Sequence, residues 1–104
     1  MVLARMSVWH FKNGKRESAF LELDRILNIS TRHTKGFRGY MSLLSVDDSN
    51  TATILTLWQD DESLKASEGG VFAEAIKKVQ DSLASSPYIE HYRVFSTELF
   101  QRSE

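Results

Sequence analysis

The order of strand-like and helix-like segments is the feature that most restricts the fold of this chain. Four segments rich in branched and aromatic residues predict β-strands at residues 2–11, 37–46, 51–59 and 88–99. Two segments with apolar residues at three- and four-residue spacing predict α-helices within residues 16–36 and 60–87. The elements are therefore expected to follow one another as βαββαβ.

Each predicted helix has one apolar face and a marked end. Gly36 follows basic residues and is a suitable stop for the first helix, and Pro87 ends the second. Gly69 and Gly70 interrupt the second helix, where two glycines cost ~2 kcal/mol relative to alanines, so a kink or break is expected there. The apolar faces consist of Phe20, Leu23, Ile26, Leu27 and Ser30 in the first helix, and of Leu64, Val71, Phe72, Ala75, Ile76, Val79 and Leu83 in the second.

A βαββαβ chain predicts an α+β, ferredoxin-like fold with a four-stranded antiparallel sheet. At this length we expect one domain over residues 1–104. The polar residues 47–50 predict a β-hairpin between the second and third strands. If Val46 opposes Thr51 across this hairpin, Trp58 opposes Gly39, and the residues that share the face of Trp58 are Met41, Leu43, Ile54 and Thr56.

Both faces of the predicted sheet are apolar. The third strand directs Ile54 and Trp58 to one face, and Leu55 and Leu57 to the other. The other strands are mixed in the same way, with Phe37, Met41 and Leu43 against Tyr40, Leu44 and Val46, and with Ile89, Phe95 and Leu99 against Tyr88, Tyr92 and Val94. Two helices after right-handed crossovers cover only one face, so the other face needs a partner. The pattern predicts a homodimer in which two copies pack sheet to sheet.

The composition argues against several classes of function. A formal net charge of −1 lacks the basic field of nucleic-acid-binding proteins. The absence of cysteine removes disulfides, thiolate chemistry and cysteine metal sites, and the three histidines lack the spacing of metal ligands. No segment is long and apolar enough to span a bilayer or to act as a signal peptide, so we expect a cytoplasmic protein without a membrane partner.

Two segments carry a resemblance to a known family. LTLWQDDESLKASEGGVFAEAIKKV (55–79) and KGFRGYMSLLS (35–45) resemble the antibiotic-biosynthesis-monooxygenase (ABM) domain of the dimeric α/β-barrel superfamily. The likeness extends over residues 3–99. It implies the dimeric barrel, but not one chemistry, because the family includes cofactor-independent oxygenases of aromatic polyketides, haem-degrading enzymes, isomerases of small signal molecules and proteins of no known activity.

The resemblance implies that Trp58 lines a pocket between the sheet and the helices. The strand and helix patterns add four further residues to the predicted substrate-binding set: Met41, Thr56, Phe72 and Ile76. His91 and His10, both on strands, are the candidate catalytic acid or base. Tyr40 or Tyr92 is a candidate to hydrogen-bond an oxygen of the substrate.

The chain departs from the haem-degrading members at two positions. Ile76 stands where those proteins carry the histidine that binds iron, and Ser7 stands where their first strand carries an asparagine. Many family members also place a histidine nine residues after the tryptophan, where this chain has Ser67. We therefore expect no haem, and no other cofactor is predicted.

Two functions of different classes remain. One is a cofactor-independent monooxygenase whose small aromatic or enolisable substrate reacts with oxygen through its own carbanion. The other is a non-catalytic dimer that binds a small molecule or has a regulatory role. A histidine or arginine close to Trp58 would favour catalysis, whereas a purely apolar lining would favour binding or a structural role.

Overall fold

The structure is a computed structural model that describes residues 1–98; Leu99, which the prediction assigned to the last strand, lies outside the described residues. Four strands, three α-helices and one short 3₁₀ helix follow one another in the predicted order. Their bounds are β1 (Leu3–His10), α1 (Arg16–His33), β2 (Phe37–Leu44), β3 (Thr51–Trp58), α2 (Asp61–Glu68), α3 (Val71–Val79), η1 (Gln80–Ser82) and β4 (Tyr88–Arg93).

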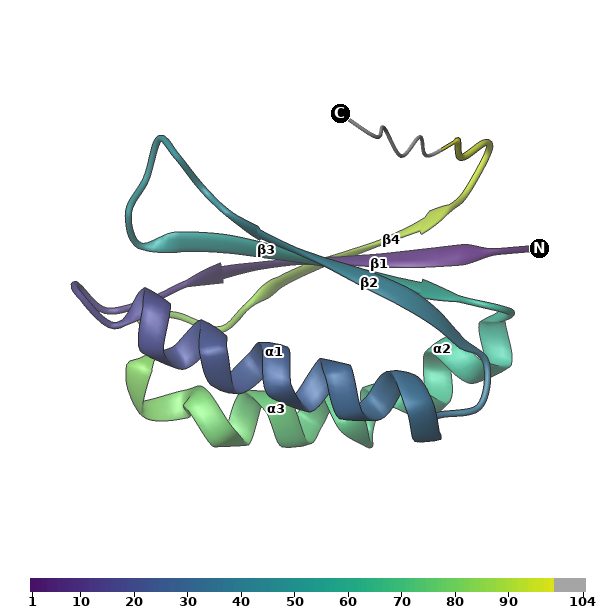
Figure 1. Ribbon diagram of the computed structural model, residues 1–104, viewed down its shortest axis with the longest axis horizontal. Coiled ribbons are helices and arrows are strands. Elements are labelled where there is room, and N and C mark those ends of the chain that lie inside the picture. The colour runs from purple at the N-terminus through teal and green to yellow at the C-terminus, as the bar shows by residue number, and fades with distance from the viewer. Residues whose placement is uncertain (99–104) are drawn as a thin grey trace, which may run out of the picture.

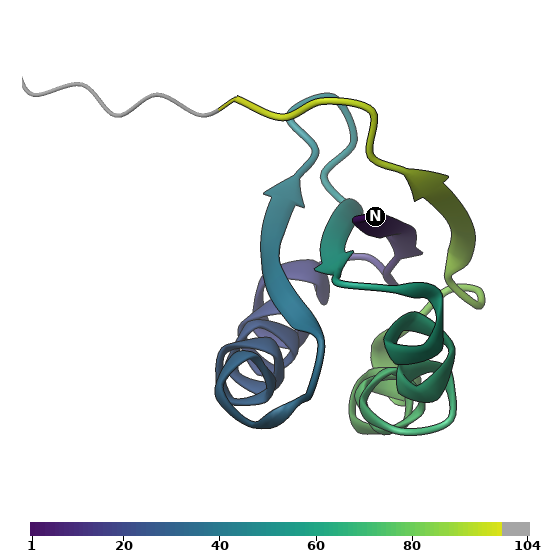
Figure 2. The ribbon, with the colours of Figure 1, turned by 90° about the vertical axis from the view of Figure 1, so that its right-hand side faces the viewer.

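The four strands form one antiparallel sheet in the order β2-β3-β1-β4. This is the strand order of a ferredoxin-like fold, so the predicted fold class is confirmed. All three α-helices lie on one side of the sheet (Figures 1 and 2). The last strand is shorter than predicted, because β4 ends at Arg93 and Phe95 beyond it is 97% exposed.

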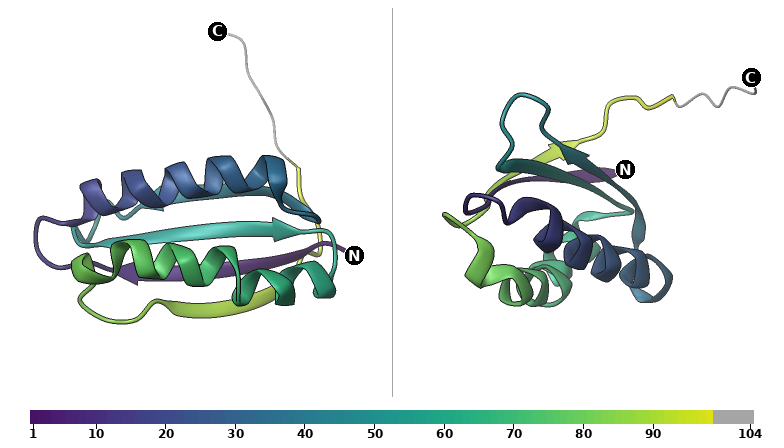
Figure 3. Two further views of the ribbon diagram at one scale, coloured as in Figure 1. Left: turned by 90° about the horizontal axis from the view of Figure 1, so that it is seen from below. Right: turned by 60° about the vertical axis from the view of Figure 1, so that its left-hand side comes forward.

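The core fills the space between the sheet and the helices. Helix α1 packs over β2 and β3 while α2 packs over β1 and β3, as Figure 3 shows from the helix side. The predicted face of α1 is turned inward, with Phe20, Leu23 and Leu27 buried. The helix then ends near Gly36, whose φ of +80° suits glycine and whose carbonyl accepts a hydrogen bond from Gln59.

The predicted break in the second helix is also present. Helix α2 ends at Glu68, Gly69 and Gly70 follow, and α3 begins at Val71. Asp60 caps the start of α2 by accepting a hydrogen bond from the backbone N–H of Ser63 at 2.8 Å, which lowers the pKa of its carboxyl group. The two glycines therefore divide the predicted second helix into two short helices, α2 and α3.

The hairpin register differs by one residue from the prediction. Leu44 opposes Ala52, and the loop between the two strands begins at Ser45. The Ser45 Oγ accepts hydrogen bonds from the backbone N–H groups of Asp47 and Asp48, and these bonds hold the longer loop. A bulge between Phe37 and Gly39, with Gly39 at a φ of +149°, then shifts the pairing once more.

The shift changes which residues accompany Trp58. Trp58 lies opposite Phe37, not Gly39, and the two rings stack with centroids 4.8 Å apart. Met41 and Leu43 were predicted on the face of Trp58 and lie instead on the opposite face, because a one-residue slip reverses every side chain of a strand. Both are nearly half exposed there, at 46% and 45%.

Candidate functional site

A small cavity lies between the sheet and the helices under Trp58. Its volume is about 30 Å³, which is room for one or two water molecules. The walls include Trp9 and Trp58 from the sheet and Leu27 and Phe72 from the helices. Most of the lining is therefore apolar, and Trp58 itself is 3% exposed.

Arg5 is the charged residue of this cavity, and its guanidinium is buried at 3% exposure. Its Nη2 donates hydrogen bonds to the Leu64 carbonyl at 2.9 Å and to Ser67 Oγ at 2.6 Å. Its Cζ lies 5.6 Å from the ring centroid of Trp58 and 4.9 Å from that of Phe72. The cation is thus held between two aromatic rings, an arrangement that favours a desolvated arginine.

The hydrogen-bonding capacity of Arg5 is not filled. Its Nε is buried and has no hydrogen-bond partner among the described residues. The nearest carboxylate belongs to Glu68, 3.8 Å from Nη2 and 46% exposed. Burial lowers the pKa of Arg5, and the charge of Glu68 opposes that shift only in part. A buried cation with a free donor is a feature that an anionic ligand would complete.

The strand register places Arg5 in the middle of a row that crosses the whole sheet. Thr56 of β3 lies directly opposite Arg5 on one side and His91 of β4 on the other. Tyr40 of β2 is opposite Thr56 and completes the row. Directly opposed residues have Cβ atoms about 4.5–5.5 Å apart. Tyr40, Thr56 and His91 were all proposed as site residues from the sequence, and they lie in one row with Arg5, which was not proposed.

His91 also reaches the cavity through Glu68. Its Nε2 lies 3.0 Å from Glu68 Oε1, and the same oxygen lies 3.8 Å from Arg5 Nη2. Glu68 belongs to the last turn of α2, which also supplies the carbonyl and hydroxyl partners of Arg5. The histidine, the carboxylate and the guanidinium thus form a short chain from the surface to the cavity.

The other predicted site residues fall into two groups. Trp58, Thr56 and Phe72 line the cavity, and the Trp58 Nε1–H donates to Thr56 Oγ1 at 2.9 Å. Ile76 packs against the core without lining the cavity, and Met41, which was expected on the face of Trp58, lies on the opposite face of the sheet. The candidate base His10 lies at the other end of β1, exposed, with its Nδ1 3.2 Å from Thr51 Oγ1.

The signal for Arg5 was present in the alternation of β1. Ala4, Met6 and Val8 point to the uncovered face, whereas Arg5, Ser7 and Trp9 point to the helices. If Ala4, Met6 and Val8 are instead assigned to the core of the monomer, the two faces of β1 are exchanged and Arg5 is placed in solvent. The predicted apolar uncovered face accommodates Ala4, Met6 and Val8, and the alternation of the strand then turns Arg5 inward.

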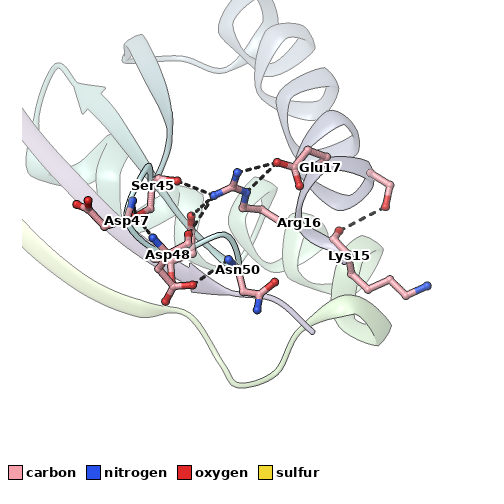
Figure 4. A network of polar contacts seen from close by, with 9 residues as sticks. Lys15, Arg16, Glu17, Ser45, Asp47, Asp48 and Asn50 are labelled. Carbon is pink, nitrogen blue, oxygen red and sulfur yellow. Dashed lines mark hydrogen bonds and ion pairs between the residues drawn. The ribbon is translucent and has the colours of Figure 1, made fainter. Parts of the chain in front are cut away.

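The chain has a second buried arginine with the opposite character. Arg16, at the start of α1, donates through Nη1 to the carbonyls of Ser45, Asp48 and Thr51 at 2.8, 3.1 and 3.2 Å. Its Nε and Nη2 both bind Glu17 Oε2 (Figure 4). All three nitrogens have partners, so Arg16 holds the β2–β3 loop and is not a candidate binding group.

Within residues 1–98 no group of three or more histidine or acidic side chains is placed to hold a metal ion. None of the helices described is of the length and apolarity that crossing a bilayer requires.

The fold, with its cavity between a four-stranded sheet and one layer of helices, defines the chain as a ferredoxin-like α+β protein. Residues 1–95 match the family described as antibiotic biosynthesis monooxygenase (ABM), and the chain belongs to that family. The family predicted from the sequence is thereby confirmed. No curated protein matches the chain.

Solved structures support the same fold. A protein from Nitrosomonas europaea proposed to be an antibiotic biosynthesis monooxygenase superposes with a TM-score of 0.77 at 18% identity, over 90% of each chain. One from Caulobacter crescentus CB15, proposed to have the same activity, gives 0.77 at 18% identity over 91% of each chain. A conserved protein from Methanosarcina mazei Go1 gives 0.75 at 21% identity, over 89% of this chain and 92% of the other. At these identities the similarity establishes the fold alone.

Proposed function

We propose that this ABM-family protein is a cofactor-independent monooxygenase for a small aromatic or enolisable substrate. The observation that carries the proposal is the buried guanidinium of Arg5 in an otherwise apolar, aromatic cavity. In such a place a cation stabilises a developing enolate oxygen far better than it would in water. The non-catalytic alternative, a dimer that binds a small molecule, would use the same cation only to hold an anionic ligand.

The residues around Arg5 supply the remaining parts of this chemistry. His91, next to Arg5 in the sheet, is the proposed base that takes a proton from the substrate. The aromatic walls exclude water from the resulting carbanion while it reacts with oxygen. Because the cavity of about 30 Å³ is smaller than such a substrate, α2 must move away from the sheet on binding. The joint at Gly69 and Gly70 is the proposed place of that movement.

Oxygen consumption tests the proposal. With a panel of anthrones, naphthols and 1,3-diketones, we expect at least one compound to be oxidised without added metal or flavin. Arg5→Met should lower the rate by ~10²-fold, as the loss of an oxyanion-stabilising donor does elsewhere, and an oxygen electrode measures both rates. Arg25→Met, at an exposed arginine paired with Glu22 on α1, is the matched control and should leave the rate unchanged. Failure of the whole panel to exceed the uncatalysed rate would favour the binding alternative.

We also propose that the protein is a homodimer formed through the uncovered face of the sheet. On that face the exposed apolar side chains include Met41 and Leu43 of β2 and Tyr88 and Tyr92 of β4. An apolar surface that extends from one edge of the sheet to the other is unusual for a monomer. A second copy presents the same surface, so the two faces can cover each other around a two-fold axis.

A charge placed on this face should separate the copies. Light scattering should give about twice 11.9 kDa for the wild-type chain, and Leu43→Glu should give a monomer at micromolar concentration. Leu21→Glu, on the exposed side of α1, is the matched control, because Leu21 is 74% exposed and lies away from the sheet face. A wild-type chain that is monomeric at this concentration would contradict the dimer.

A further inference from the structure

A second, larger hollow lies beside the Arg5 cavity at the ends of β1 and β4. This groove has a volume of about 420 Å³, within the ~300–1,000 Å³ typical of small-molecule sites. The last turns of α2 separate it from the cavity, since Leu64 and Glu68 line the groove while the Leu64 carbonyl and Ser67 Oγ bind Arg5. Residues of this one helix therefore contact both the groove and the buried guanidinium of Arg5.

The charged side chains of the groove are of both signs. His91 and Arg93 come from β4, and Asp61, Lys65 and Glu68 come from α2. Asp61 and Lys65 neutralise each other in an ion pair of 2.8 Å. Among the described residues that line the groove, Glu68 is the one other acidic residue, and it lies close to His91 and to Arg5 beneath it.

The carboxylate of Glu68 occupies the junction of the groove and the cavity. One of its oxygens is 3.0 Å from His91 Nε2 and 3.8 Å from Arg5 Nη2. The distance to Arg5 is too long for a hydrogen bond, and the Nε of the same guanidinium has no partner at all. Glu68 is also 46% exposed and sits on the turn before Gly69, so it is able to leave this position.

We propose that the groove binds a small organic acid whose carboxylate replaces that of Glu68 between Arg5 and His91. The carboxylate fits the small space at Arg5, and the organic part of the acid lies in the groove against Leu3 and Leu64. A free carboxylate can approach the guanidinium in the bidentate manner that the tethered Glu68 does not reach. Arg93 adds positive charge at the mouth of the groove.

Two ligands of the same shape and different charge test the proposal. Benzoate and benzamide are titrated by calorimetry into the protein, and the indole N–H signals of Trp9 and Trp58 are followed by NMR. We expect benzoate to bind at least tenfold more tightly than benzamide and to shift the Trp58 signal, since Arg5 lies against that ring. Arg5→Met should remove the preference for benzoate, and Arg25→Met should retain it.

Glu68→Gln gives an independent and opposite expectation. It removes the internal carboxylate, so benzoate should bind several-fold more tightly, and this result decides the matter if Arg5→Met does not fold. Equal binding of the two ligands, no binding of either, a preference that survives Arg5→Met in a folded protein, or weaker binding to Glu68→Gln would each overturn the proposal. Binding is measured without turnover, so a protein that consumes no oxygen leaves these outcomes unaffected.

Discussion

Replacing Trp58 by alanine should lower the free energy of unfolding by ~3–5 kcal/mol, as the loss of a fully buried tryptophan does in other cores. The indole is 3% exposed, stacks on Phe37 and forms one wall of the cavity. Trp58→Phe should cost only about 1 kcal/mol, because it keeps most of the volume. It nevertheless removes the N–H that binds Thr56 and the indole ring that lies 5.6 Å from the Cζ of Arg5. Urea unfolding measures the stability of both variants.

Trp9 provides a closely matched control for the phenylalanine variant. It is 1% exposed, and its Nε1–H donates to Ser7 Oγ at 2.8 Å, just as that of Trp58 donates to the hydroxyl two residues before it. Trp9 packs on Phe11 and Phe72, whereas the guanidinium of Arg5 lies over the rings of Trp58 and Phe72. Trp9→Phe and Trp58→Phe should therefore lose similar stability, while Trp58→Phe should impair oxygen consumption more strongly, because its ring lies against Arg5. If both variants changed the rate of oxygen consumption equally, Trp58 would have no role in the site beyond its packing in the core.

The sequence predicted the fold because each strand and helix carries its own local signal. The period of the apolar residues identified α1 and its inward face. Gly36 marked the end of that helix, and Gly69-Gly70 marked the break before α3. These signals depend on neighbours three or four residues away, so they need no knowledge of tertiary contacts. The end of β4 had no such signal, since apolar residues continue past Arg93 although the pairing does not.

The register of the hairpin was beyond the same reasoning. Its loop is set by hydrogen bonds from Ser45 and by Arg16, a residue 29 positions away from Ser45 in the sequence. The bulge before Gly39 adds a second one-residue shift. Because side chains alternate strictly along a strand, each single shift exchanges the two faces, and Met41 was assigned to the wrong one.

The site was predicted in its outline but not at its centre. Trp58, Thr56 and Phe72 follow from the pattern of β3 and of the second helix, and they surround the cavity. Arg5 was not predicted as a site residue, because a charged residue within a mostly apolar segment is ordinarily assigned to the solvent-exposed side of the strand. In the structure the uncovered face takes Ala4, Met6 and Val8 of β1, which leaves the arginine to face the helices.

Arg16→Met should destabilise the protein by ~3 kcal/mol or more, the second large effect that the structure predicts. The substitution leaves the carbonyls of Ser45, Asp48 and Thr51 without their shared charged donor, and hydrogen bonds to a charged group contribute ~1.5–3 kcal/mol. It also releases the loop that sets the register of β2 (Figure 4). Urea unfolding monitored by circular dichroism measures the loss.

Arg5→Met is the informative comparison for Arg16→Met, since both remove a buried arginine of similar exposure. Removing one partner of an ion pair is costly when the other charge is left buried, but Glu68 is 46% exposed and stays hydrated without Arg5. Arg5 has one unpartnered nitrogen and a distant carboxylate, whereas every nitrogen of Arg16 is bound. We therefore expect Arg5→Met to change the free energy of unfolding by less than ~1 kcal/mol while it impairs ligand binding. If Arg5→Met were as destabilising as Arg16→Met, Arg5 would be a structural residue and its free donor would carry no functional meaning.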